Sequence, residues 1–131
     1  GRPSYRQDVV DSVIKTLSLD NTKTVIEIGA GTGIFTRSLV PSNAKIIAVE
    51  PVEAMRTHLK KSIPDIDVHN GRGDSIPVED GVADGIVIAQ AFHWMATNDT
   101  LKELSRVLKP KGKVVLVWNA MDQLFPWVKE L

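Results

Sequence analysis

The sequence of 131 residues has no cysteine, no net charge and no long apolar run. The absence of cysteine excludes disulfides, thiol nucleophiles and thiolate zinc sites. Its three histidines, His58, His69 and His93, are not spaced like metal ligands, so no metal site is predicted. Sixteen basic residues balance sixteen acidic ones, so no nucleic-acid partner is expected.

No apolar segment approaches the length that crosses a bilayer, and no signal peptide opens the sequence as given. We therefore expect no membrane partner and a cytoplasmic location.

Apolar runs rich in β-branched residues alternate with segments of helical period. The runs at 24–28, 45–50, 66–69, 85–89 and 113–118 are the expected strands. Such alternation predicts an α/β fold with a mainly parallel sheet and helices on both faces. The 131 residues contain no linker, repeat or low-complexity tract, so we expect one domain over residues 1–131.

The first expected strand runs directly into a glycine-rich turn, Gly29-Ala30-Gly31-Thr32-Gly33, and the second ends in Glu50. Glycines let a backbone approach a ligand where a Cβ would collide. A carboxylate at the end of the next strand can accept hydrogen bonds from ribose hydroxyls. The two features together predict a nucleoside-binding half-site.

The spacing of the glycines bears on which nucleotide would bind. Counting from Gly29, the dinucleotide fingerprint G-x-G-x-x-G/A requires a small residue at position 34, but the third glycine is Gly33 and Ile34 follows. A pyrophosphate site is therefore disfavoured, and no Gly-Lys-Ser/Thr of a P-loop is present. A tight structural turn remains the alternative.

Several motifs together resemble those of class I S-adenosylmethionine-dependent methyltransferases, most closely the small-molecule group called type 11. They are Glu27 to Gly33, Val49-Glu50-Pro51, Gly73-Asp74, the segment Ala89 to Met95, and Leu108-Lys109-Pro110-Lys111-Gly112. The resemblance covers nearly the whole chain. It implies a Rossmann-like three-layer α/β/α sandwich, with S-adenosylmethionine as cofactor and S-adenosylhomocysteine as product.

The resemblance also implies roles for individual residues. Gly29 and Gly31 would lie beneath the methionine part of the cofactor, Glu27 would face its ammonium, and Glu50 would hold the ribose. Asp74 would accept a hydrogen bond from the adenine amino group, and the amide of Ser75 would meet a ring nitrogen. The implied cofactor-binding residues are Glu27, Gly29, Ala30, Gly31, Gly33, Glu50, Pro51, Gly73, Asp74, Ser75 and Gln90.

Each of these roles has a structural alternative. Glu27 could cap neighbouring amides, and Gly73-Asp74 could form an ordinary turn. His93 is the candidate general base, although it could equally be a structural histidine. Tyr5 and Arg6 could close over the cofactor carboxylate.

The acceptor expected from the resemblance is a small molecule. Gln90-Ala91-Phe92-His93 occupies the place of the Asn/Asp-Pro-Pro-Tyr/Phe motif associated with amino-group methylation. An oxygen or carbon nucleophile is therefore favoured, with a carboxylate as one possibility by analogy. The alternatives are a non-catalytic cofactor-binding or scaffolding domain and, less favoured, a nicotinamide-linked oxidoreductase.

The number of strands departs from the family pattern. Class I methyltransferases usually have seven strands in the order 3-2-1-4-5-7-6, whereas we count five, in the order 3-2-1-4-5. Residues 121–131 are too short for two further strands and a helix, so we expect either that the sequence is part of a longer protein or that the sheet stops after strand five with an exposed edge. An exposed edge invites pairing, and we expect either a second copy, as a homodimer, or the C-terminal segment to cover it.

Overall fold

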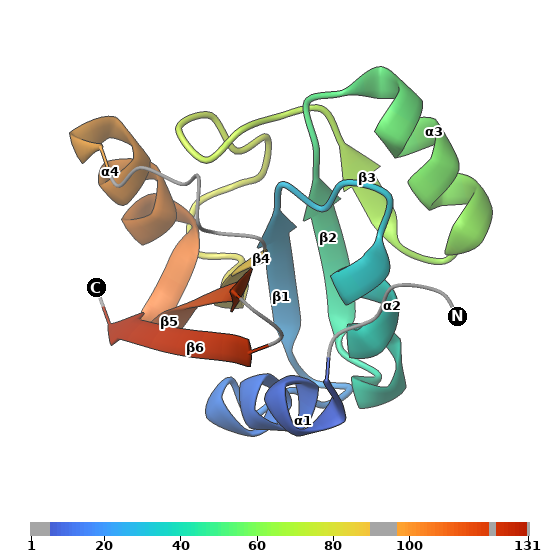
Figure 1. The fold of residues 1–131 in the computed structure, drawn as a ribbon. Helices are drawn as coiled ribbons and strands as arrows, with labels where there is room; N and C mark the ends of the chain where they lie inside the picture. Colours follow the sequence, from blue (N-terminus) through green and yellow to red (C-terminus); the bar gives the residue numbers. More distant parts are fainter. Residues whose placement is uncertain (1–5, 90–96, 121–122, 131) are drawn as a thin grey trace.

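The computed structural model describes the backbone of residues 6–89, 97–120 and 123–130, and side chains within residues 6–89 and 97–117. The helices are α1 (Gln7–Thr16), α2 (Ile34–Leu39), α3 (Glu53–Ser62) and α4 (Asn98–Val107), with a 3-10 turn η1 (Val40–Ser42) after α2. The strands are β1 (Thr24–Ile28), β2 (Lys45–Val49), β3 (Asp67–His69), β4 (Ala83–Ala89), β5 (Leu108–Ala120) and β6 (Gln123–Glu130). Figure 1 shows their arrangement.

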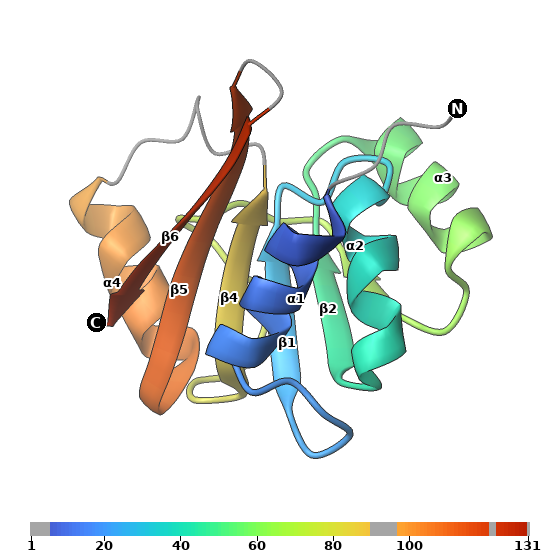
Figure 2. The ribbon, with the colours of Figure 1, turned by 60° about the horizontal axis from the view of Figure 1, so that its bottom comes forward.

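The strands form one sheet in the order β3-β2-β1-β4-β5-β6. The first five are parallel, which confirms the predicted order 3-2-1-4-5. Helices α1, α2 and α3 pack on one face and α4 on the other, so the three-layer architecture is also confirmed (Figure 2).

The expectation that the sheet stops after strand five is wrong, because the sheet has a sixth strand. Strand β6 pairs antiparallel with β5 along its length, from Lys113 opposite Glu130 to Ala120 opposite Gln123. A hairpin needs only a short turn and a second strand, so residues after 120 suffice for one antiparallel strand. Of the two alternatives for this edge, the C-terminal segment is the one observed, and a homodimer through β5 would have to displace β6.

Two apolar cores follow from the alternation of side chains along β1. Val25 packs under α1 and α2, whereas Ile26 and Ile28 pack on the face covered by α4. Because successive side chains of a strand point to opposite faces, Glu27 shares the face of Val25. A carboxylate is thereby directed into the layer between the sheet and α2.

The chain turns sharply between α4 and the regular part of β5, where the sequence predicted a stop. Leu108 is opposite Ala83 and Lys113 is opposite Gly85, so the residues between them bulge out of the ladder. Lys111 there has a φ of 69°. From Lys113 to Val117 the pairing with β4 is one to one.

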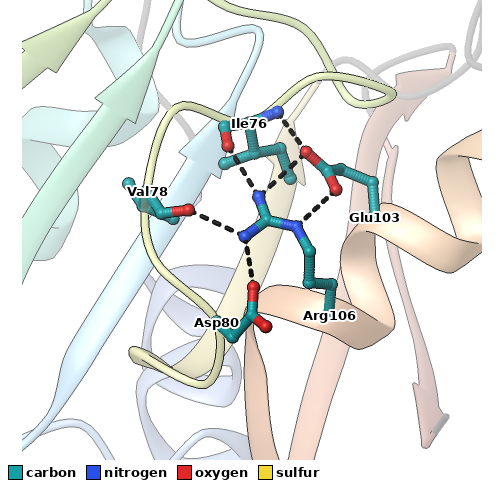
Figure 3. A network of polar contacts seen from close by, with 5 residues as sticks. All are labelled: Ile76, Val78, Asp80, Glu103 and Arg106. Carbon is teal, nitrogen blue, oxygen red and sulfur yellow. Dashed lines mark hydrogen bonds and ion pairs between the residues drawn. The ribbon is translucent and has the colours of Figure 1, made fainter.

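Arg106 of α4 anchors the loop that leads into β4 (Figure 3). Its guanidinium donates to the carbonyls of Ile76 at 2.8 Å and Val78 at 2.9 Å. It also pairs with Glu103 at 2.6 Å and Asp80 at 2.7 Å. Glu103 in turn accepts the amide of Ile76 at 2.6 Å. This network secures the segment directly after the predicted Gly73-Asp74 motif.

Replacing Arg106 with methionine should lower the free energy of unfolding by about 1–3 kcal/mol, because two partly buried carbonyls lose their donors. The matched control is Asp80→Asn, which removes only an ion pair to a side chain that is 81% exposed and should cost about 0–1 kcal/mol. Urea denaturation of both variants measures the difference. Equal losses in the two variants would show that the carbonyl contacts contribute nothing.

Candidate functional site

The loop between β1 and α2 leaves the backbone open at two of its glycines. Gly29 has a φ of 70° and Gly31 a φ of 61°, and apart from the adjacent residues no described atom lies within 4 Å of a Cβ built at either. Left-handed backbone favours glycine. The turn is therefore held in a conformation that exposes its backbone.

A hollow of about 230 Å³ lies over this turn, at the carboxyl ends of β1 and β4. It is lined by Glu27, Gly29, Ala30, Gly31, Thr32, Ile34, Phe35, Met55 and Ala89. Open α/β sheets bind their ligands at this edge. The structure thus brings together four of the predicted cofactor residues: Glu27, Gly29, Ala30 and Gly31.

Gly33, which was also predicted to bind the cofactor, has a packing role in the structure. A Cβ on Gly33 would collide with the side chain of Leu59 from α3, and its φ is 91°. It does not line the hollow. The early third glycine is explained by the close approach of the Leu59 side chain of α3 to the start of α2.

Glu27 is a buried carboxylate with one unsatisfied oxygen. Its Oε1 accepts a hydrogen bond from the Thr36 hydroxyl at 2.5 Å. Its Oε2 has no partner within the described part of the chain, and the residue is 1% exposed. Burial raises the pKa of Glu27 to about 8, opposed by the Thr36 hydrogen bond and reinforced by the charge of Glu50. A buried polar atom without a partner is costly, so an approaching cation would be stabilised there.

Glu50 lies at the glycine turn, but both its oxygens are already engaged by the backbone. Oε1 accepts the amide of Gly31 and Oε2 the amide of Val52, each at 2.8 Å. Each oxygen retains a further lone pair, so ribose hydroxyls could still donate to it. Glu50 therefore ties the glycine turn to the start of α3, a structural role that the sequence did not predict.

Pro51 is exposed and does not line the hollow. Arg56 of α3 donates to the carbonyls of Glu50 at 3.0 Å and Pro51 at 2.8 Å. The chain after β2 is therefore fixed from both sides, by its own carboxylate and by this arginine.

The Gly73-Asp74 motif forms the tip of a tight turn. The amide of Ser75 donates to the Arg72 carbonyl at 3.0 Å, and the amide of Arg72 donates back to the Ser75 carbonyl at 3.1 Å. The Ser75 amide is thus used within the turn, not free for an adenine nitrogen as predicted. Asp74 is exposed. The turn stands near the end of β2, because a Cβ on Gly71 would lie 3.0 Å from Val49 Cγ1.

Several predicted residues lie outside the described residues: Gln90, His93 and Tyr5, together with the side chains beyond residue 117. Arg6 is described, and its guanidinium pairs with the exposed Asp8 at 2.7 Å. Within the described ranges, no group of three or more histidine or acidic side chains could hold a metal ion. Over the same residues, no helix has the length and apolar character needed to cross a bilayer.

Several residues of the site were not predicted from the sequence, among them Thr36, Phe35 and Met55. Phe35 and Met55 line the hollow, and Thr36 holds Glu27. A polar residue one turn into a short apolar helix after a glycine loop is the only signal that pointed to Thr36. Met55 carries no such signal, because its place over the turn depends on how α3 packs.

A larger hollow, of about 650 Å³, lies at the opposite edge of the sheet. Its lining includes Lys23, Lys109, Lys111, Lys113 and Asp84. Asp84 already accepts the Thr24 amide at 2.8 Å and pairs with Lys109 at 3.3 Å. This hollow lies at the amino ends of the parallel strands, whereas such sheets bind their ligands at the carboxyl ends.

Comparison with known proteins identifies the family of the chain. The sequence profile of the family described as "Methyltransferase domain" matches residues 26–116. An uncharacterised methyltransferase-like protein of Schizosaccharomyces pombe is 40% identical over 99% of this chain and 51% of its own length. An uncharacterised methyltransferase of Mycobacterium bovis is 35% identical over 100% of this chain and 52% of its own. The chain spans about half the length of the curated relatives it matches.

Solved structures share the fold at lower identity. A SAM-dependent methyltransferase from Aquifex aeolicus superposes with a TM-score of 0.74 at 24% identity, covering 87% of this chain and 67% of its own. The [4+2]-cyclase SpnF superposes with a TM-score of 0.75 at 20% identity, covering 89% and 47%. The same fold therefore occurs in proteins named for different chemistry, and the site must decide function.

Proposed function

The chain belongs to the methyltransferase-domain family, and on that premise we propose that it binds S-adenosylmethionine over the turn between β1 and α2. We further propose that the protein transfers the methyl group to a small-molecule oxygen or carbon nucleophile. The observation that carries the proposal is Oε2 of Glu27, which has no hydrogen-bond partner among the described residues and lies at an open glycine turn.

The chemistry of the hollow suits a cationic ligand with an apolar body. Its lining combines apolar side chains from Ile34, Phe35 and Met55 with exposed backbone and one carboxylate. An ammonium or sulfonium near Glu27 would supply the positive charge that the buried oxygen lacks. Glu50 would accept from the ribose through its remaining lone pairs.

Bound S-adenosylmethionine would supply an activated methyl group on a positively charged sulfur. The residues of the chain would then have to align an acceptor with that methyl group and exclude water, which accounts for most of such catalysis. We propose His93 as the base for an acceptor that carries its proton at working pH. A carboxylate acceptor rests on analogy with the family alone.

Calorimetric titration distinguishes the candidate ligands. We expect S-adenosylhomocysteine to bind at one site, and NAD to bind at least tenfold more weakly, because the Gly-x-Gly-x-Gly spacing gives no pyrophosphate turn. Tighter binding of NAD would overturn the proposal in favour of a nicotinamide-linked oxidoreductase.

Transfer of labelled methyl to small acids and phenols is the second experiment. Product formation supports the enzyme. Tight binding of S-adenosylhomocysteine without transfer to any acceptor would favour a cofactor-binding scaffold.

A further inference from the structure

The hydroxyl of Thr36 makes an unusual contact for a threonine inside a helix. Such hydroxyls commonly bond to the carbonyl one turn earlier on their own helix. Here the hydroxyl crosses from α2 to β1 and donates to Oε1 of Glu27, and Thr36 is completely buried. The contact joins the helix after the glycine turn to Glu27, which is the only carboxylate among the described residues that line the hollow.

We propose that Thr36 is a positioning residue: it holds one oxygen of Glu27 and so reserves the other for the ammonium of the bound cofactor. The inference rests on the proposed function and deepens it. It also explains why Oε1 is satisfied while Oε2 is left without a partner in the described structure.

Because the neighbours of Glu27 are mostly uncharged, the hydrogen bond from Thr36 influences the pKa of the Glu27 carboxyl. Beside it, β2 presents Ala48 and β4 presents Val87, while α2 presents Phe35 and α3 presents Met55, none of which carries a charge. The charged group acting on Glu27 among the described residues is Glu50.

The ligand-free carboxyl therefore holds its proton up to a pH of about 8. Binding of an ammonium beside it favours the charged form. Cofactor binding at neutral pH should then release a proton from Glu27. Because the Thr36 bond lowers the pKa of Glu27, it makes that release easier.

The experiment compares Thr36→Val, which removes the hydroxyl at nearly constant volume, with Thr36→Ser, which keeps it. S-adenosylhomocysteine is titrated from pH 6 to 9 in pairs of buffers with different ionisation enthalpies, which reports affinity and proton release together. Thr22→Val, at an exposed threonine that bonds only Asp20, is the matched control. Glu27→Gln measures the titration of the ligand itself.

For the wild-type protein we expect affinity to rise with pH until about 8, with proton release at pH 7. Thr36→Val should weaken binding at pH 7 by about tenfold or more, since a bond to a charged group is lost, and should move the rise to higher pH. Thr36→Ser should restore the wild-type profile, and Glu27→Gln should abolish proton release.

Two failures can be told apart. If the wild-type protein binds at no pH, the proposed function is wrong and this inference falls with it. If it binds, but Thr36→Val shows the wild-type pH profile and proton release, the inference alone is wrong. Urea unfolding of each ligand-free variant shows whether it is folded.

The same unfolding curves give a readout that needs no ligand. The folded carboxyl keeps its proton to a pH of about 8, whereas the unfolded one loses it near 4.5. The stability that this adds is complete below pH 4.5 and is lost as pH rises through 8. Thr36→Val should extend the loss to higher pH, and Glu27→Gln should remove it; a Thr36→Val profile equal to wild type would contradict the coupling.

Discussion

Replacing Gly33 with alanine is expected to lower the free energy of unfolding by about 2–5 kcal/mol, from left-handed strain together with overpacking. The strain arises from the φ of 91°, and the overpacking from the collision with Leu59. Chemical denaturation of the purified variant measures the loss.

Gly81 supplies the matched control. It also has a positive φ, of 64°, but no described atom lies within 4 Å of a Cβ built there. Gly81→Ala should therefore cost only the conformational part, about 1–2 kcal/mol. If both alanines cost the same, close packing is not what requires glycine at position 33.

A double-mutant cycle with Leu59 isolates the packing part. Leu59→Ala alone should cost about 2–5 kcal/mol, because a completely buried side chain is truncated. In the double variant the smaller side chain leaves room for the new Cβ. The combined loss should then be at least about 1 kcal/mol smaller than the sum of the single losses, and an additive cycle would contradict contact between α2 and α3 as the cause.

Glu50→Ala is expected to act on both the fold of the site and its ligand. The amides of Gly31 and Val52 lose a charged acceptor, so the free energy of unfolding should fall by about 2–4 kcal/mol. The affinity for S-adenosylhomocysteine should also fall, by about 1–3 kcal/mol, because ribose hydroxyls lose the same acceptor. Denaturation and calorimetry at one pH give the two numbers.

Glu50→Gln is the intermediate variant, and Glu79→Ala is the control for the losses of stability and affinity expected in Glu50→Ala. Glutamine keeps one acceptor oxygen and should lie between wild type and alanine in both measurements. Glu79 is an exposed carboxylate, and its replacement should change stability by less than about 0.5 kcal/mol. Loss of stability in Glu50→Ala with full ligand affinity would leave Glu50 only the structural role.

The two glycine roles show what local pattern can and cannot reveal. Gly29, Gly31 and Gly33 look alike in the sequence, and all were predicted to meet the cofactor. Two of them border the hollow, whereas Gly33 meets a leucine of α3. The sequence shows that a small residue is required, but not which neighbour requires it.

Glu27 and Glu50 also show that a sequence pattern does not reveal which neighbours a residue contacts. Glu27 and Glu50 were predicted from a strand end and a motif, and both lie at the turn. Within the described residues one oxygen of Glu27 has no partner, whereas each oxygen of Glu50 accepts a backbone amide, and this difference depends on elements far apart in the chain. Thr36 and Met55 entered the site for the same reason.

By itself, the sequence determined the alternation of strands and helices and the position of the glycine turn, because apolar period and turn residues act locally. The order of the parallel strands was implied by the resemblance of its motifs to a known family. Only the tertiary structure decided the pairing of β6 with β5, the contact of Gly33 with Leu59, and the hydrogen bond from Thr36 to Glu27. These three contacts depend on burial and on which side chains pack together from different elements, and a local sequence pattern does not encode such contacts.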